Sequence, residues 1–436
     1  MMPPPSPAAD LPGPLPGPLP GPLPGPLPGH VVASGYYGYR NSGDEAILIV
    51  LLDQLRRLGV HQSWILTEMP GRIDALYAGQ GAQGLRDWEM LGFLGFKNLL
   101  RGRLFRKIGI QARARLFIYG GGSIFRDVGM SRKNLYRLLD DIFLARLCRV
   151  PIFFYALGVG PIESPWARRL LGMAARAADV ITVRDEPGAA LLRQIGVPEA
   201  RITVVTDPAF LLPDADPGQA ARDAGLEAFL ARHPKTLFVY PTMEMVGPPL
   251  ADGDSLLHET ADALSLLCRE DGWAVVLLPM EVLTEAEHAR GILDDVLVNR
   301  RIAAAMDPAA AVHCMEVALP PDQMRALTSL ATLNVTARLH AMIYAVSQGI
   351  PCVALNYHPK VAGNAARFGL SDRVIDFAPG WQHRMVAEVR RLAVEMPEAR
   401  AALAARLPAL HAAAAETFRQ LARLLHGRSP QGRPPA

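Results

Sequence analysis

Cysteine is scarce in this chain, and the few cysteines are scattered. The 436 residues include four cysteines, Cys148, Cys268, Cys314 and Cys352, and no pair has the spacing of a zinc site or a redox motif. We therefore expect reduced thiols in apolar surroundings and a cytoplasmic protein. The histidines form no H-x-x-x-H or H-E-x-x-H arrangement and the aspartates form no calcium-binding loop, so we expect neither a metal site nor a cofactor.

Long apolar runs and an excess of one charge are also missing. No uncharged apolar run reaches the roughly 18 residues that a membrane-spanning helix needs, and no Lys or Arg precedes His30 as in a signal peptide. With 45 basic and 42 acidic side chains, nothing predicts nucleic-acid binding. Residues 101–115 are a local exception, because Arg and Lys alternate there with apolar side chains. This stretch predicts either an amphipathic helix at a membrane surface or an ordinary solvated helix face.

Changes in composition divide the chain. Residues 1–29 are low in complexity, with Gly-Pro-Leu-Pro repeats whose prolines remove backbone donors, so we expect a disordered or semi-rigid tail. Residues 213–234 are rich in Asp, Pro, Ala and Gly and predict a linker. Two domains are therefore expected, over residues 30–212 and 235–426, followed by a polar tail from 427 to 436.

Strand and helix patterns alternate through both domains. This rhythm predicts an α/β fold with two Rossmann-like doubly wound domains facing across a cleft, as in GT-B enzymes. An Ala-rich helical pattern closes the second domain over residues 397–425, and Pro408 should kink or split that helix.

Three cationic or titratable side chains follow strand patterns of the second domain. Between residues 333 and 360 the sequence predicts a buried strand, a helix and a second buried strand. Arg338 and His340 then lie where the first strand ends, and Lys360 lies just past the second. Because parallel strands joined in this way end at one edge of the sheet, the three should converge beside a helix N-terminus. A small, highly charged anion is the expected ligand.

Glycine-rich turns follow strand patterns of the first domain. They contain neither the G-x-G-x-x-G dinucleotide fingerprint nor a Walker lysine, but their glycines allow a ligand close to the backbone. Asn41 and Asp44 either cap the next helix or meet sugar hydroxyls. Asp127 follows the second turn, and Arg184 follows a later strand, where it pairs with Asp185 or Glu186 or binds a ligand. The candidate substrate-binding residues are Gly38, Asn41, Asp44, Gly121, Gly122 and Ser123.

Several short motifs occur in a fixed order. They are Gly35-Tyr36-Tyr37-Gly38, Asn41 to Ala46, Gly120 to Ser123, Gly158 to Pro161, Val183-Arg184-Asp185, Asp207-Pro208-Ala209, Arg338-Leu339-His340 and Tyr357 to Val361. In this set the chain resembles the polysaccharide pyruvyl transferases, of the CsaB type that decorates cell-wall polysaccharide for S-layer anchoring. Leu157 and His358 depart from the family pattern, which puts acceptor choice in doubt.

The resemblance implies an enzyme with phosphoenolpyruvate as donor substrate, bound by Arg184, Arg338, His340 and Lys360. The acceptor it implies is a sugar, N-acetylmannosamine on an undecaprenyl carrier, reached by peripheral contact with the inner face of the cytoplasmic membrane. In the mechanism we expect, His340 protonates the donor methylene, a sugar hydroxyl attacks C2, and a second hydroxyl closes a ketal as phosphate leaves. Asp44 or Asp127 orients or deprotonates the acceptor.

Two other functions fit parts of the sequence. A GT-B glycosyltransferase would use the same cations on the diphosphate of a nucleotide sugar. A non-catalytic scaffold of envelope assembly would use the proline-rich head and the basic stretch for partners, although it has no need of a cationic cleft. Acceptor-dependent release of phosphate from phosphoenolpyruvate would separate the three.

Overall fold

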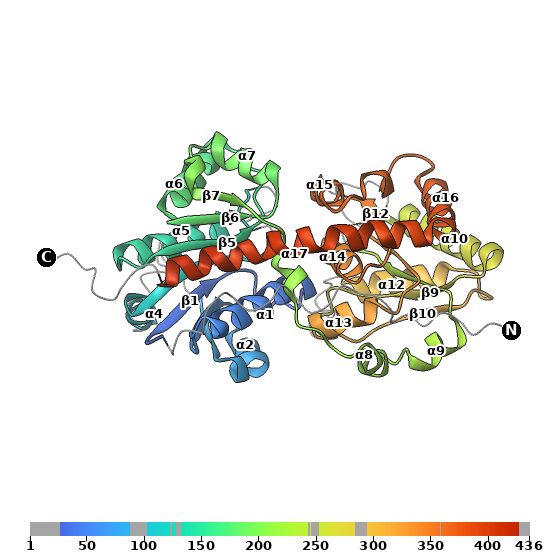
Figure 1. Cartoon of the computed structure of the whole chain (residues 1–436), viewed down its shortest axis with the longest axis horizontal. Helices are drawn as coiled ribbons and strands as arrows, with labels where there is room; N and C mark the ends of the chain where they lie inside the picture. The colour runs from blue at the N-terminus through green and yellow to red at the C-terminus, as the bar shows by residue number, and fades with distance from the viewer. Residues whose placement is uncertain are drawn as a thin grey trace, which may run out of the picture. The chain divides into compact units, whose positions relative to one another are not determined.

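The computed structural model describes residues 27–87, 103–122, 124–127, 132–242, 245, 253–283, 294–357 and 359–426. The proline-rich head up to residue 26 and the tail from residue 427 lie outside these residues, so their predicted disorder stays a prediction. Contacts between residues divide the chain into two units (Figure 1). Among the described residues, the N-terminal unit contains residues 27–212 and 413–426, and the C-terminal unit contains residues 213–412. The predicted arrangement of the two units across a cleft stays a prediction.

The N-terminal unit contains a parallel sheet of seven strands in the order β3-β2-β1-β4-β5-β6-β7. The strands are β1 (His30–Ser34), β2 (Ser63–Thr67), β3 (Ala82–Arg86), β4 (Ala114–Gly120), β5 (Ile152–Leu157), β6 (Val180–Val183) and β7 (Ile202–Val204). Its main helices are α1 (Ser42–Arg57), α2 (Pro70–Tyr77), α4 (Arg103–Ala112), α5 (Arg132–Leu147), α6 (Pro165–Ala177) and α7 (Glu186–Gln194). Every residue of β5 is buried, as expected for a central parallel strand covered on both faces. The strand order reverses between β1 and β4, where such sheets bind ligands.

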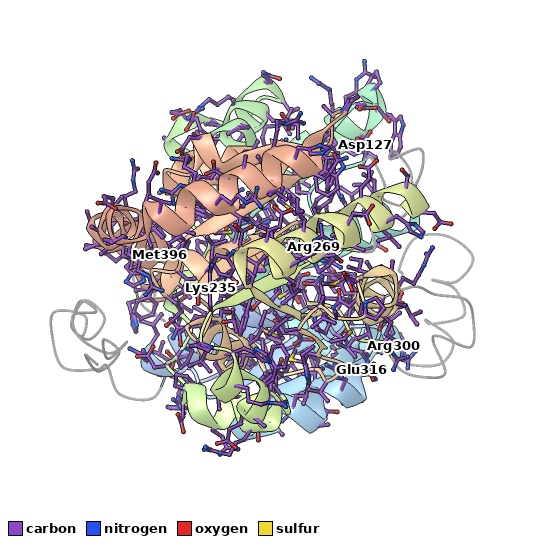
Figure 2. The ribbon with its side chains drawn as sticks, turned by 90° about the vertical axis from the view of Figure 1, so that its right-hand side faces the viewer. Asp127, Lys235, Arg269, Arg300, Glu316 and Met396 are labelled. Carbon is purple, nitrogen blue, oxygen red and sulfur yellow. The ribbon has the colours of Figure 1, made fainter. Side chains whose placement is uncertain are left out.

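The C-terminal unit contains a parallel sheet of six strands in the order β10-β9-β8-β11-β12-β13. The strands are β8 (Thr236–Tyr240), β9 (Ala274–Leu277), β10 (Val312–Cys314), β11 (Leu333–Thr336), β12 (Cys352–Asn356) and β13 (Val374–Asp376). Its main helices are α8 (Pro217–Asp223), α9 (Glu227–Arg232), α10 (Gly253–Asp271), α12 (Asp295–Ala305), α13 (Pro321–Thr328), α14 (Leu339–Ser347), α15 (Pro359–Phe368) and α16 (Trp381–Val394). On one face, Val239 and Val335 pair in register within a core that includes residues of α10, α12 and α16. Charged pairs such as Arg300 with Glu316, at 2.6 Å, lie at the surface (Figure 2).

Two predictions about the chain after residue 212 need correction. Residues 213–234 are not simply a linker, because they form α8 and α9. The last helix, α17 (Met396–His426), runs through Pro408 as one element, so the predicted split is wrong. Leu403, Leu407 and Leu410 bury a stripe on either side of the proline, and such burial offsets the roughly 3 kcal/mol that an internal proline costs. No helix among the described residues is both long and apolar enough to cross a membrane.

One residue of the basic stretch is buried rather than solvated. Lys107, on α4, is 1% exposed, and its Nζ lies 2.8 Å from Asp87 Oδ1 and 2.5 Å from Asp141 Oδ1. Ser34 donates a hydrogen bond of 3.1 Å to the other oxygen of Asp141. Burial by itself lowers the pKa of Lys107, but the two carboxylates outweigh it and raise the pKa above its usual range. Lys107 therefore neutralises carboxylates inside the unit, and this position cannot belong to an interfacial face.

Replacing Lys107 with Met should destabilise the N-terminal unit strongly. The change leaves two buried carboxylates without their cation, which should cost about 3–5 kcal/mol of unfolding free energy. Arg57→Met is the matched control, because Arg57 pairs with Asp53 at 2.7 Å on the surface and its loss should cost at most about 1 kcal/mol. Urea denaturation of both variants measures the difference, and equal losses would contradict the interpretation.

Candidate active site

The two glycine-rich turns of the N-terminal unit meet around Tyr37. Its side chain is fully buried, and a Cβ added to Gly121 would lie 2.6 Å from the phenol oxygen. A Cβ on Gly122 would overlap the Asp44 carboxylate. Both glycines also have positive φ, at +86° and +75°, a conformation that glycine adopts without steric cost. The sequence-predicted residues Asp44, Gly121 and Gly122 thus lie together where the sheet order reverses.

The other predicted residues of these turns have structural partners. Asn41 caps α1, since its side-chain oxygen accepts from the N–H groups of Gly43 at 3.1 Å and Asp44 at 3.4 Å. The backbone N–H of Gly38 donates to Glu45 at 3.0 Å, and Tyr77 donates to the other oxygen of Glu45. Glu45 therefore fixes the first turn, a role that the sequence analysis missed. Ser123 lies outside the described residues.

Asp127 is held by the backbone at the start of α6. Its two carboxylate oxygens accept hydrogen bonds from the N–H groups of Glu163 at 2.9 Å and Ser164 at 2.8 Å. Partial burial favours a higher pKa for Asp127, but these hydrogen bonds prevail and lower it. A carboxylate stabilised in this way is a weak base. Of the two acidic candidates, Asp44 is therefore better suited to deprotonate an acceptor.

Arg184 forms a buried ion pair at the end of β6. Its Nη1 lies 2.5 Å from Asp207 Oδ2, with 4% and 1% of the two side chains exposed. Asp207 is therefore the ionic partner that the structure shows. Of the two acidic neighbours considered from the sequence, Asp185 caps α7 through Gly188 and Glu186 pairs with Arg193. Asp207 opens the Asp-Pro-Ala motif that the resemblance included, so the sequence contained a signal for this partner.

The phenol of Tyr37 shares this electrostatic environment. Burial raises its pKa well above the usual value, Asp44 and Glu45 raise it further, and Arg184 opposes them. Among the described residues the Tyr37 hydroxyl has no hydrogen-bond partner. Tyr37 is therefore a protonated donor beside the Asp44 carboxylate.

In the C-terminal unit, Arg338 occupies the N-cap position of α14, just after β11, without a side-chain hydrogen bond to the helix. Its Nη2 lies 2.5 Å from Asp295 Oδ1 and 3.8 Å from Glu281 Oε2. The other oxygen of Asp295 accepts from the N–H groups of Met280 at 3.0 Å and Glu281 at 3.1 Å, which fixes the carboxylate. Burial favours a lower pKa for Arg338, but Asp295 outweighs it and raises the pKa. The Nε of Arg338 is buried and has no hydrogen-bond partner among the described residues.

His340 and Lys360 follow neighbouring strands. His340 lies in the first turn of α14, and its Nε2 is buried. Lys360 is the second residue of α15, and its side chain lies outside the described residues. Since β11 and β12 pair in parallel, with Thr336 opposite Ala354, the starts of α14 and α15 follow the same edge of the sheet. Convergence of the three cationic groups stays a prediction.

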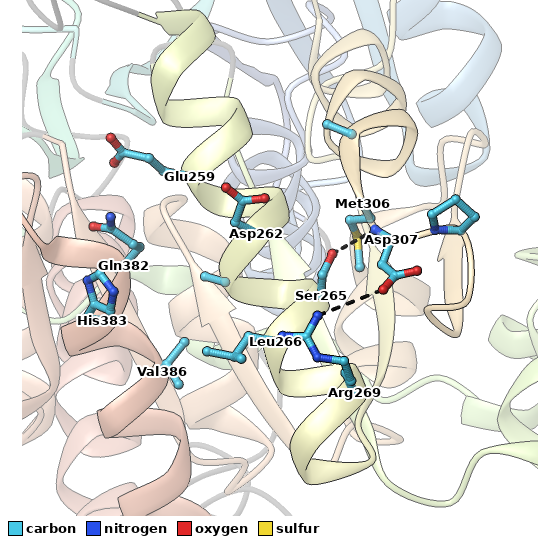
Figure 3. Close-up of a pocket in the computed structure, with 13 residues that line it drawn as sticks. Glu259, Asp262, Ser265, Leu266, Arg269, Met306, Asp307, Gln382, His383 and Val386 are labelled. Carbon is cyan, nitrogen blue, oxygen red and sulfur yellow. Dashed lines mark hydrogen bonds and ion pairs between the residues drawn. The ribbon is translucent and has the colours of Figure 1, made fainter.

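A separate hollow of about 690 Å³ lies along α10 and α16 (Figure 3). Its walls include Asp262, Arg269, Asp307 and His383. Ser265 accepts a hydrogen bond of 2.9 Å from the backbone N–H of Asp307. None of the predicted site residues lines this hollow. Within the described residues, no three His, Cys, Asp or Glu side chains are grouped to hold a metal ion.

Solved structures similar to this chain share its two-unit architecture. A UDP-GlcNAc 2-epimerase from Neisseria meningitidis, bound to UDP-GlcNAc, has a TM-score of 0.60 and 12% identity, covering 91% of this chain and 99% of its own. HepE from Anabaena, in complex with UDP and glucose, has a TM-score of 0.59 and 12% identity, covering 92% and 100%. A glycosyltransferase from Rickettsia africae has a TM-score of 0.60 and 10% identity, again covering 92% and 100%. At these identities the likeness establishes the fold alone, which is GT-B.

The family is established from the sequence itself. The model of the family described as polysaccharide pyruvyl transferase matches residues 41–359, well over half of the chain. The matched range includes Asp44, Gly121, Arg184, Arg338 and His340. This chain belongs to the polysaccharide pyruvyl transferase family and is a transferase.

Proposed function

We propose that the protein transfers a pyruvyl group from phosphoenolpyruvate to a sugar of a cell-wall polysaccharide or of its lipid-linked precursor. The acceptor sugar in this proposal is N-acetylmannosamine, the products are a pyruvate ketal and phosphate, and no cofactor takes part. The observation that carries the proposal is the family match together with Arg338 and His340 at the start of α14. We place the reaction in the cytoplasm, at the membrane surface.

The donor half of the proposal rests on Arg338. Asp295 accepts from Nη2 and holds the planar guanidinium in one orientation, while the buried Nε–H has no hydrogen-bond partner among the described residues. A donor carboxylate or phosphate oxygen is a natural acceptor for such a fork. The N–H groups at the start of α14 add partial positive charge beside it. Lys360 and Arg184 complete the donor-binding set in this proposal.

The chemistry requires one proton transfer to carbon and two new C–O bonds. Protonated His340 gives its proton to the methylene carbon, which becomes a methyl group and leaves an oxocarbenium-like centre at C2. One sugar hydroxyl attacks C2, the C2–O bond to phosphate breaks, and a second hydroxyl of the same sugar closes the ketal. Of the two hydroxyl protons, one restores His340 and the other leaves with phosphate, so atoms and charges balance.

The acceptor half of the proposal rests on the N-terminal unit. Asp44 lies against Gly122, and the Tyr37 hydroxyl lies against Gly121. A carboxylate acceptor beside a phenol donor suits a sugar hydroxyl, which both donates and accepts. We assign Asp44 the task of orienting or deprotonating the acceptor. Asp127, whose oxygens accept two backbone hydrogen bonds, is the weaker candidate.

A glycosyltransferase that uses a nucleotide sugar is the second candidate. The similar GT-B structures bound to UDP or UDP-sugars favour it, but the family match does not. Thermal protection separates the two functions, because phosphoenolpyruvate should raise the melting temperature of a pyruvyl transferase and UDP-sugars should not.

Replacing His340 with Ala should reduce acceptor-dependent phosphate release by about two to four decades, because the proton donor is lost. Binding of phosphoenolpyruvate should weaken far less than turnover, because Arg338, Arg184 and Lys360 remain in the proposed donor site. His383→Ala is the matched control, since His383 is exposed on α16 and should leave turnover unchanged. Stopped assays of phosphate release measure both variants. Unchanged turnover in His340→Ala rules out the proton-transfer role.

Replacing Arg338 with Lys should weaken phosphoenolpyruvate binding by roughly tenfold or more, because a point charge cannot reproduce the planar fork. Isothermal titration calorimetry measures the affinity. Arg269→Lys, at a surface position on α10, provides the control and should bind the donor as the parent protein does. Equal affinities for all three proteins would remove Arg338 from the donor site.

Replacing Asp44 with Asn should reduce pyruvyl transfer by about a hundredfold while leaving the affinity for phosphoenolpyruvate unchanged. Asp127→Asn is the paired variant and should have the smaller effect, because its carboxylate serves the start of α6. Transfer is followed by mass spectrometry of the acceptor. A larger loss in Asp127→Asn would reverse the assignment.

A further inference from the structure

Three neighbouring helices of the N-terminal unit expose large apolar side chains. Helix α5 packs against both α4 and α6, and the three are seen together in Figure 1. Phe105 on α4 is 64% exposed, and Phe143 and Leu147 on α5 are 63% and 68% exposed. Trp166 and Met173 on α6 are 37% and 54% exposed. Exposed apolar side chains on helices that pack against one another are the composition expected of an interaction surface.

The same helices expose cations but no carboxylates among their described residues. The sequences of α4 and α6 contain no acidic residue, and the acidic residues of α5, Asp140 and Asp141, are both buried. The carboxylates nearest to α6 along the chain, Glu163 and Asp179, lie beyond its ends. The exposed cations are Arg106 on α4, Arg146 on α5, and Arg168, Arg169 and Arg176 on α6.

Some of these cations have partners within the protein. Arg146 lies 3.7 Å from Asp179, and Arg176 donates to the carbonyl of Ile195 at 2.9 Å. The guanidinium of Arg106 lies 5.7 Å from the ring centroid of Trp64. Each of these partners lies at or near the surface, so the charges remain available to a large anionic surface. We call the exposed side chains the α4–α6 face: Phe105, Arg106, Phe143, Arg146, Leu147, Trp166, Arg169, Met173 and Arg176.

The exposed apolar residues of the C-terminal unit have a different setting. They are Val317, Leu330 and Val394, which lie on separate segments. Exposed Glu316 directly precedes Val317, and Glu395 directly follows Val394. Single exposed apolar residues beside charges are ordinary. The α4–α6 face differs because its apolar side chains come from adjacent helices and are interspersed with charges of one sign.

We propose that the α4–α6 face docks onto an anionic lipid bilayer. Phe, Leu, Trp and Met side chains would enter the acyl boundary, while the arginines meet lipid phosphates. Charge decides among partners, because the face offers no exposed carboxylate for the basic residues of a protein partner. The apolar side chains have no counterpart on a nucleic-acid backbone. The proposal is independent of the reaction proposed above, although it would bring the protein to a lipid-linked acceptor.

Vesicle flotation with the full-length protein tests this docking. Binding to phosphatidylcholine vesicles that contain phosphatidylglycerol should exceed binding to pure phosphatidylcholine vesicles and should fall as salt is raised. The double variant Arg146→Glu and Arg169→Glu should bind at least about tenfold more weakly. The triple variant Phe105→Ser, Phe143→Ser and Leu147→Ser should also lose binding, because little apolar surface remains to insert.

Matched variants on the C-terminal unit provide the control. Val317→Ser with Leu330→Ser and Val394→Ser removes as many exposed apolar side chains. Arg222→Glu with Arg269→Glu reverses as many surface charges. Both control proteins should float with anionic vesicles as the parent does. Circular dichroism and thermal melting confirm that each variant folds.

Three results would overturn the proposal. The first is equal binding to neutral and anionic vesicles. The second is retention of binding by both α4–α6 variants. The third is a parent protein that binds only duplex DNA or only a second copy of itself, the latter seen as dimers by light scattering that the α4–α6 variants lack. Flotation needs neither phosphoenolpyruvate nor a sugar. Loss of membrane binding would therefore contradict the docking proposal but not the proposed reaction. A protein that floats with vesicles but transfers no pyruvyl group would contradict the proposed reaction but not the docking.

Discussion

A buried arginine held by an aspartate at the end of a parallel strand recurs in both units. Arg184 follows β6 and pairs with Asp207, and Arg338 follows β11 and pairs with Asp295, each at 2.5 Å. A buried cation without a partner is costly, and a buried pair is costly to break. Each aspartate also accepts backbone N–H groups, Asp207 from Ala209 and Asp295 from Met280 and Glu281. Backbone hydrogen bonds therefore hold the two carboxylates in place, and the carboxylates orient the guanidinium groups of Arg184 and Arg338.

The glycine-rich turns follow from the same edge geometry. Parallel strands β1 and β4 end side by side, so the turns that follow them compete for one volume. Tyr37 and Asp44 fill that volume, which leaves no room for a Cβ at Gly121 or Gly122. The glycines are thus needed first to pack the turns around Tyr37 and Asp44.

Local sequence patterns predicted what depends on neighbouring residues. The buried runs of β11 and β12, the helix after Arg338 and the doubly wound architecture all follow from periodicity and glycine placement. The strands β2, β3 and β13 were not identified. β13 has only three residues. β3, at the sheet edge, has a central glycine and only two buried positions, Ala82 and Leu85, which weakens a strand signal.

Ion pairs between residues that are far apart in sequence could not be predicted from the sequence alone. In the sequence, Lys107 is one more cation on a basic helix. Its ion-pair partners, Asp87 and Asp141, come from other segments of the fold, so the local sequence does not indicate them. Asp295 lies 43 residues from Arg338 in sequence, and nothing local links them. A pattern shows which face of a helix is charged, but only tertiary structure shows whether that face meets water or a buried carboxylate.

The charges around Arg338 limit how an anion can bind at the proposed donor site. Arg338 has one positive charge and faces two carboxylates, Asp295 at 2.5 Å and Glu281 at 3.8 Å. This cluster by itself does not attract a trianion, since its carboxylates outnumber its cation. The N–H groups at the starts of α14 and α15, which follow adjacent strands, must therefore supply part of the attraction. Protonated His340 and Lys360 add the remaining positive charge in the proposed mechanism. In the proposed mechanism, Asp295 orients the guanidinium, and donor binding depends on the helix starts as much as on the arginine.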